Sequence, residues 1–182
     1  MKPSSLALEK THLANLLEAI QRCVYFLDAS SQKIAWPLTA QKLQSQQKDI
    51  DLFEAMAAIN ERFAKLQDTL AAAMRHACLL SAEPADNFLK VLSFFEKNQV
   101  IESVELWQLC RTARNLAAHG YETDYQEIAE HFNTLNRLTA NLYLTAQRFQ
   151  DYCKTILGIE TQHQDFAAEF SAITANIKPI NH

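Results

Sequence analysis

Residues 111–121 carry the side-chain types that can cleave a phosphodiester without a metal. Arg111, Asn115 and His119 follow one another at intervals of four residues, and Arg114 lies in the same stretch. On a helix the first three share one line, whereas Arg114 and His119 diverge by about 140°. Histidine transfers protons near neutral pH, and the planar guanidinium of arginine holds phosphate oxygens. These types suit acid–base cleavage of RNA, with arginine stabilising the charge of the transition state.

The cleavage step needs both an acid and a base, and this segment contains one histidine. A two-fold dimer would bring a second copy of His119 to the same site. The spacing also fits a plain alternative, a solvated polar face on a surface helix. Arg114 would then only interact favourably with the negative end of the helix dipole. The residues alone therefore make this segment a candidate site.

The composition predicts an all-α protein. The 182 residues include only two glycines and four prolines. A β-rich chain needs turn residues every ~8–12 positions, and this chain does not supply them. The hydrophobic share of 48% is sufficient for a full core without metals or cross-links. We expect one antiparallel bundle of four to five helices over residues 1–157, followed by a short helix and tail over 158–182.

Apolar residues at intervals of three and four predict where the helices lie. The expected helices cover about residues 6–29, 49–80, 86–97, 103–119 and 123–157, with a weak terminal helix near 166–173. Pro37 disfavours helix at Trp36, so residues 30–47 are expected to form a connector.

Polar residues and glycines mark the expected helix ends. Asp86 and Ser103 are expected to cap the two middle helices, and Thr123 with Gln126 fits a capping box. Gly120 and Gly158 occupy positions typical of helix-ending glycines. On the helix that contains Arg114, the face expected to be buried comprises Leu106, Leu109, Cys110, Ala113, Leu116 and Ala117.

Several classes of site and location are not expected. The four cysteines are far apart and form no Cys-x-x-Cys pair, so we expect buried reduced thiols and neither a zinc site nor another cofactor. The net charge of −4 and the lack of a long basic run argue against a broad phosphate-binding surface for nucleic acid, although a small cationic pocket stays open, and DNA is not an expected partner. No run approaches the ~20 apolar residues of a membrane span, and no signal peptide is recognisable. We expect a cytoplasmic protein without a membrane partner.

Two segments resemble a known family. One reads Arg114-Asn115-Leu116-Ala117-Ala118-His119-Gly120-Tyr121, and the other covers residues 62–70. The first resembles the R-x4-H-x-Y motif of the HEPN superfamily, in its HepT-like branch, and the second resembles a recurrent segment of that branch. The resemblance extends over about residues 49–157.

The resemblance implies a function as well as a fold. Such proteins are helical bundles that dimerise so that two motifs meet at a cleft. Many are metal-independent endoribonucleases, the toxins of toxin–antitoxin pairs whose antitoxin is a minimal nucleotidyltransferase that transfers AMP onto the motif tyrosine. Carried over, Arg114 and His119 would be catalytic, Asn115 would orient them, and Tyr121 would be the modification site. The expected partners are then a second copy, RNA and the nucleotidyltransferase.

Other functions and roles stay open. The chain is alternatively a non-catalytic module that presents substrate to a nucleotidyltransferase, or a structural bundle without a site. Arg111 would add positive charge to the site. Asp68 is expected either to pair with Lys65 or to reach the motif helix and orient Arg114. Trp107 fits the core or a dimer interface.

Other histidines point less clearly to a site. Glu127 and His131 fit a surface ion pair better than a metal site, because a third ligand is not evident. His12, His76 and His163 stand alone in the sequence.

Overall fold

The computed structural model describes residues 5–116, 124–175 and 177, and in this part of the chain it contains helices and no strands. The predicted all-α class is therefore confirmed. The elements are α1 (Ser5–Ser31), α2 (Ala40–Ser45), α3 (Ile50–Leu80), α4 (Phe88–Lys97), α5 (Val104–Leu116), α6 (Tyr125–Tyr152), the π-helical turn η1 (Cys153–Leu157) and α7 (Ala167–Thr174).

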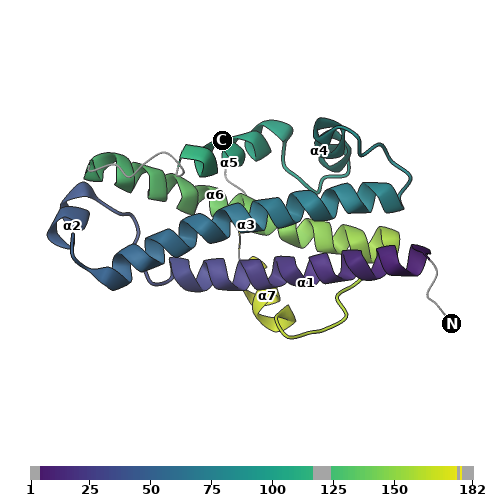
Figure 1. Ribbon diagram of the computed structural model, residues 1–182, viewed down its shortest axis with the longest axis horizontal. Helices are drawn as coiled ribbons and strands as arrows, with labels where there is room; N and C mark the ends of the chain where they lie inside the picture. Colours follow the sequence, from purple (N-terminus) through teal and green to yellow (C-terminus); the bar gives the residue numbers. More distant parts are fainter. Residues whose placement is uncertain (1–4, 117–123, 176, 178–182) are drawn as a thin grey trace.

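Three long helices, α1, α3 and α6, run along the length of the molecule and pack against one another (Figure 1). The shorter α4 and α5 lie along the side of α3 that is upper in the view, and α5 also contacts α6. α7 packs on α1 and α6, with Phe170 buried. In the described part, no helix has the length and hydrophobicity needed to cross a membrane.

The core lies between the long helices and is built from the stripes that the sequence predicts. On α3 the residues at intervals of three and four are all buried: Met56, Ile59, Phe63, Leu66, Leu70, Ala73 and Ala77. The helix begins where Asp49 caps it, with the carboxylate accepting a hydrogen bond from the N–H of Leu52 at 3.0 Å. Periodic apolar residues and a local cap together explain this 31-residue element.

The expected connector contains a short helix that the apolar pattern of the sequence does not predict. Thr39 caps α2 by accepting a hydrogen bond from the N–H of Lys42, and Leu43 is fully buried. Asn133 on α6 bonds both the N–H and the carbonyl of Leu38, which ties the connector to the bundle. Six residues with one buried leucine are too short for a periodic pattern to reveal.

Two of the predicted helix N-caps differ from those observed. Asn87, not Asp86, caps α4, since Asp86 pairs with Lys90 instead. Asp124 caps α6, so the predicted capping box is wrong, and its Thr123 lies outside the described residues. In both cases a neighbouring polar side chain accepts hydrogen bonds from the first free N–H groups of the helix.

Two other predicted helix ends are confirmed. Ser103 accepts a hydrogen bond from the N–H of Leu106 at 3.0 Å. Gly158 ends the helix at φ +63°, a conformation that glycine adopts without a Cβ clash.

The buried face of α5 also differs from the predicted one. Leu106, Cys110 and Ala113 are buried as expected, but Leu109 is 49% exposed. Trp107 is buried in its place, which confirms core packing for that residue. α5 is therefore rotated so that the indole of Trp107, rather than the side chain of Leu109, packs against the other helices.

Candidate functional site

The side chain of Arg114 is held at the end of α5 by α3. Its Nη1 donates to Asp68 Oδ1 in a hydrogen-bonded ion pair, and its Nε lies 3.4 Å from Asn115 Oδ1. The Arg114 side chain is 23% exposed, whereas that of Asp68 is 63% exposed. A pair with so exposed a carboxylate adds less than ~1 kcal/mol to stability. Its main physical effect is to fix the direction of the guanidinium.

The contact with Arg114 distinguishes between the two interpretations of Asp68. The carboxylate reaches across to the motif helix and contacts Arg114, as one of them predicted. Gln67, its neighbour on α3, is buried and donates from Nε2 to the carbonyl of Trp107 at 3.1 Å. These two contacts, made by neighbouring residues of α3, link α5 to α3.

A cleft of about 580 Å³ opens beside this ion pair, between α1, α3, α4 and α5. Arg75, Arg111 and Arg114 line it, together with Asp68. Arg75 and Arg111 are exposed and form no ion pair within the described part of the chain. The other lining residues are His12, Gln67, Ala71, Ala72, His76, Leu79, Phe88 and Trp107. The cleft therefore has local positive charge in a protein whose net charge is −4.

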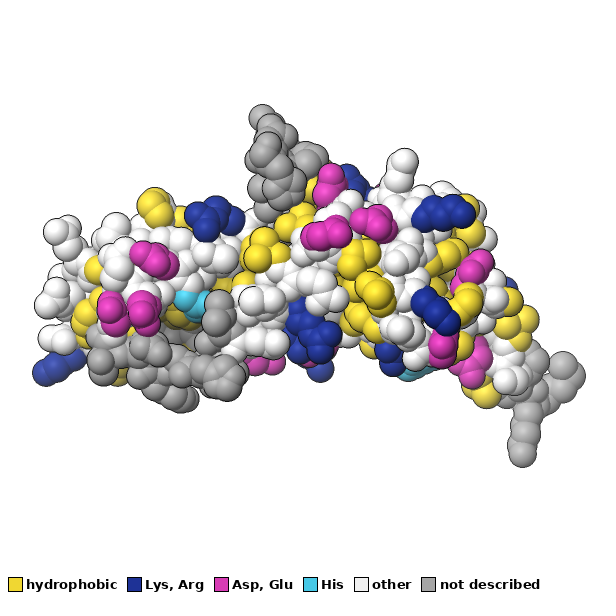
Figure 2. Space-filling view, turned by 90° about the horizontal axis from the view of Figure 1, so that it is seen from above, with side chains coloured by type: hydrophobic (Ala, Val, Ile, Leu, Met, Phe, Trp, Pro, Cys, Tyr) yellow, Lys and Arg dark blue, Asp and Glu magenta, His cyan; other side chains and the backbone are white. Residues whose placement is uncertain are grey.

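Figure 2 shows one face of the molecule, seen from the side on which α4 and α5 lie in Figure 1. Hydrophobic side chains gather over its central and right-hand parts, and Lys and Arg side chains form separate patches. A continuous basic strip does not cross this face. Binding of a nucleic acid here would depend on local contacts rather than on a broad phosphate surface.

The predicted site residues are thus partly brought together. Arg114 contacts both Asp68 and Asn115, and Arg111 lines the same cleft as Arg114. His119 and Tyr121 lie outside the residues that the structure describes.

Two histidines that stand alone in the sequence meet at this cleft. The rings of His12 and His76 pack edge to face with centroids 4.7 Å apart, and both line the cleft. His76 Nε2 lies 3.3 Å from a carboxylate oxygen of Glu9. Because the two histidines are on different helices, α1 and α3, no local spacing pattern reveals their proximity.

Another histidine, His131, lies outside the cleft. His131 is partly buried, with Nε2 3.5 Å from Asn60 Oδ1, and burial lowers its pKa. Among the described residues no group of three or more His, Cys, Asp or Glu is arranged to hold a metal ion.

The four cysteines are free thiols, and three of them are buried, as predicted; Cys23 is only partly buried. Burial raises the pKa of Cys110 to about 11 and that of Cys153 to about 12, so these two thiols stay protonated at neutral pH.

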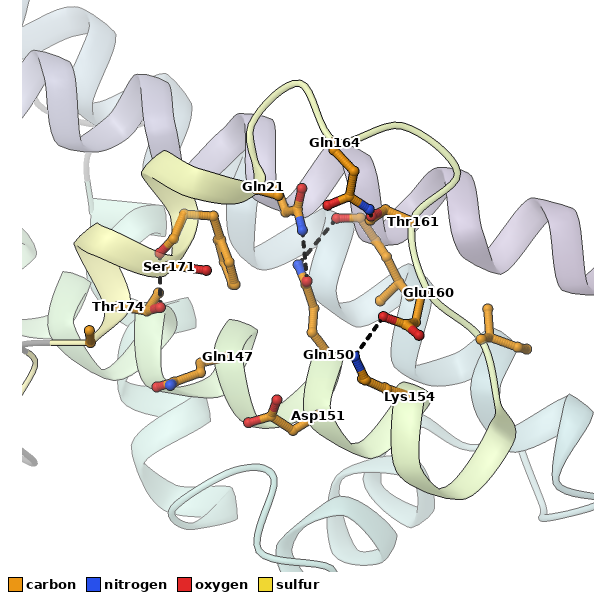
Figure 3. A pocket seen from close by; sticks show the side chains of 15 residues that line it. Gln21, Gln147, Gln150, Asp151, Lys154, Glu160, Thr161, Gln164, Ser171 and Thr174 are labelled. Atoms are coloured by element: carbon orange, nitrogen blue, oxygen red, sulfur yellow. Dashed lines mark hydrogen bonds and ion pairs between the residues drawn. The ribbon is translucent and has the colours of Figure 1, made fainter.

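A second cavity of about 360 Å³ lies between α1, α6 and the segment that leads to α7 (Figure 3). Carboxamides and hydroxyls dominate it, and Gln21 donates to Gln150 Oε1 at 2.9 Å. Among its described lining residues the one cation is Lys154, which is paired with Glu160 at 2.9 Å. The described residues of this cavity include neither an unpaired cation nor a histidine, the groups that would bind and cleave a phosphodiester.

Comparison of the chain with protein-family models, curated proteins and solved structures found no match in any of the three.

Proposed function

We propose that the protein is a metal-independent endoribonuclease that works as a homodimer. As the resemblance of residues 114–121 implies, it would be the toxin of a toxin–antitoxin pair with a minimal nucleotidyltransferase, and we expect it to act in the cytoplasm. One observation carries the proposal: Asp68 fixes the guanidinium of Arg114 at a cleft that Arg75 and Arg111 also line. A preoriented guanidinium is what stabilisation of a charged phosphoryl transition state requires.

The proposed reaction is an internal transesterification of RNA. His119 removes the proton of a ribose 2′-OH, and the resulting oxygen attacks the adjacent phosphorus. The bond from phosphorus to the 5′-oxygen breaks, which leaves a 2′,3′-cyclic phosphate. His119 of a second copy donates a proton to the departing 5′-oxygen. Arg114 stabilises the negative charge that gathers on the phosphoryl oxygens.

Tyr121 would be the site at which the partner switches the enzyme off. Transfer of AMP to its hydroxyl adds a phosphate charge and a bulky nucleoside within seven residues of Arg114. A covalently attached phosphate competes with RNA for the same guanidinium at a high effective concentration. Modification is therefore expected to block RNA binding and not only catalysis.

One observation favours the alternative, a non-catalytic binding module. Asp68 already accepts a hydrogen bond from Arg114, so an incoming RNA phosphate must compete with a carboxylate. In such a module the pair would hold α5 in place for a partner nucleotidyltransferase, and no bond of RNA would be broken.

The decisive experiment incubates purified protein with a defined RNA in excess EDTA. The nuclease proposal expects cleavage with 2′,3′-cyclic phosphate ends, and the loss of cleavage in Arg114→Ala and in His119→Ala. Arg22→Ala and His163→Ala are the matched controls, because both residues are exposed and lie outside the cleft. Circular dichroism checks that every variant keeps its helicity.

Each outcome decides between the two functions. No cleavage by the parent, after mass spectrometry has shown Tyr121 to be unmodified, rejects the nuclease and favours the binding module. Cleavage that survives in both Arg114→Ala and His119→Ala rejects this assignment of the site.

A further inference from the structure

One wall of the cleft is aromatic and carries a guanidinium. The Phe88 ring lies 6.2 Å from that of Trp107 at an interplanar angle of 56°. The guanidinium carbon of Arg75 lies 5.5 Å from the centroid of Phe88. Phe88 is partly buried and Arg75 is exposed, so one edge of this assembly faces the cleft. Flat guanidinium and aromatic groups are the surfaces on which single-stranded bases stack.

A buried hydrogen-bond acceptor without a partner lies in the same wall. Gln67 is 2% exposed, and its Nε2 donates to the carbonyl of Trp107. Because a carbonyl only accepts, this bond fixes the direction of the carboxamide. Its Oε1 is left buried and without a hydrogen-bond partner among the described residues. A ligand N–H group, such as that of a nucleobase, is the missing partner that such an acceptor needs.

The charges at the mouth of the cleft fit one phosphate. Of the three lining arginines, Arg114 is paired with Asp68, while Arg75 and Arg111 have no carboxylate partner in the described part. The volume of about 580 Å³ suits a single nucleotide and is too small for a duplex.

We propose that this cleft binds one nucleotide of single-stranded RNA next to the cleavage position. The base stacks against Phe88 and Arg75, its N–H group donates to Gln67, and its phosphate pairs with Arg111. The position relative to the cleaved bond rests on the proposed function, but binding of the nucleotide does not. Stacking is available to every base, so the cleft tolerates many sequences.

The test is the binding of a fluorescein-labelled 2′-O-methyl oligoribonucleotide to the full chain, measured by anisotropy in EDTA. This probe lacks the 2′-OH that cleavage requires, so binding is measured separately from reaction. Arg75→Gln, Arg111→Gln and Phe88→Leu are each expected to raise Kd by about five- to tenfold. Arg22→Gln is the matched control, since it removes the same charge from an exposed site outside the cleft.

The salt dependence of Kd distinguishes the phosphate contact of Arg111 from the stacking contact of Phe88. Arg111→Gln is expected to reduce the slope of log Kd against log salt by about 0.7, as the loss of one phosphate contact on a single strand does. Phe88→Leu is expected to leave this slope unchanged, because stacking releases no counterion. A duplex of the same sequence should compete poorly.

Specific results would overturn the proposal. Absence of binding by the parent, or equal Kd values for the parent, Arg75→Gln and Arg111→Gln, excludes a nucleotide in this cleft. If binding depends on these residues while unmodified RNA stays intact in EDTA, only the nuclease is rejected. If RNA is cleaved but binding ignores these residues, only the cleft is rejected.

Discussion

Among single residues, Arg114 has its orientation restricted from two sides. One guanidinium nitrogen donates to Asp68 and another lies 3.4 Å from the Asn115 carboxamide oxygen. The residue is also partly covered by the protein, so its remaining donors have a limited range of directions. Lysine can replace its charge but not this planar set of donors.

Arg114→Lys is therefore expected to lower the rate of RNA cleavage by about 100-fold, as removal of an oriented donor typically does. The free energy of unfolding should change by less than ~1 kcal/mol, because the Asp68 carboxylate is largely exposed. Initial rates in EDTA and urea denaturation measure the two effects. A lysine variant that cleaves at the parental rate would show that charge alone is sufficient.

Asp68→Asn provides the companion measurement. If Asp68 orients Arg114 for catalysis, this variant should cleave about tenfold more slowly, since small misplacements of a catalytic group are costly. If Asp68 only competes with phosphate, the variant should bind RNA more tightly than the parent.

At the scale of the helices, α6 meets α3 through a partly buried histidine. His131 Nε2 lies 3.5 Å from Asn60 Oδ1, and the imidazole packs edge to face on Phe132 with ring centroids 5.1 Å apart. Burial lowers the pKa of His131 below its ordinary value of 6.5. The folded chain thus takes up a proton on this residue less readily than the unfolded chain does.

The sign of the pH effect follows from that difference. At pH values above the pKa of this histidine in the unfolded chain, the imidazole is neutral in both states. Its contribution to the free energy of unfolding is then fully present. As the pH falls through the folded pKa, the unfolded state is favoured because it binds the proton more tightly. Between about pH 7.5 and about pH 5, His131→Gln should therefore lose less stability than the parent. Urea denaturation at each pH measures this, and parallel curves for the two proteins would contradict it.

The helix boundaries show how far local sequence information extends. The long helices begin and end close to where periodic apolar residues predict, and Gly158 ends η1 as expected. The predicted caps Asp86 and Thr123 each lie one residue before the observed caps Asn87 and Asp124, because adjacent polar side chains compete for the same free N–H groups. The helix α2 was not predicted because its one buried residue, Leu43, makes no repeating pattern.

For the molecule as a whole, α4 is held to the bundle by aromatic contacts. Phe95 is fully buried, with its ring centroid 5.5 Å from that of Phe149 and 5.3 Å from that of Tyr152 on α6. The same helix carries Phe88 into the cleft. Phe88 and Phe95 are seven residues apart and share one face of α4, so the core packing of Phe95 helps to position Phe88 at the cleft.

Phe95→Ala is expected to lower the free energy of unfolding by about 3–5 kcal/mol, the range for removing a buried aromatic ring. Leu89→Ala on the same helix is the matched control. Because Leu89 is 53% exposed, it should change stability by less than about 0.5 kcal/mol. Guanidinium denaturation compares the two, and equal losses would contradict the docking of α4 described above.

The amino-acid sequence by itself determined the helical class and the buried stripe of α3, because helix periodicity and capping are local properties. It also singled out Arg114 and its neighbours as chemically suitable. Only the tertiary structure decided which residues meet in one cleft. Asp68 and Arg114 are 46 positions apart, and Gln67 and Trp107 are 40 apart. Such contacts depend on how α5 rotates on α3, which is set by the packing of Trp107 rather than by any spacing within one helix.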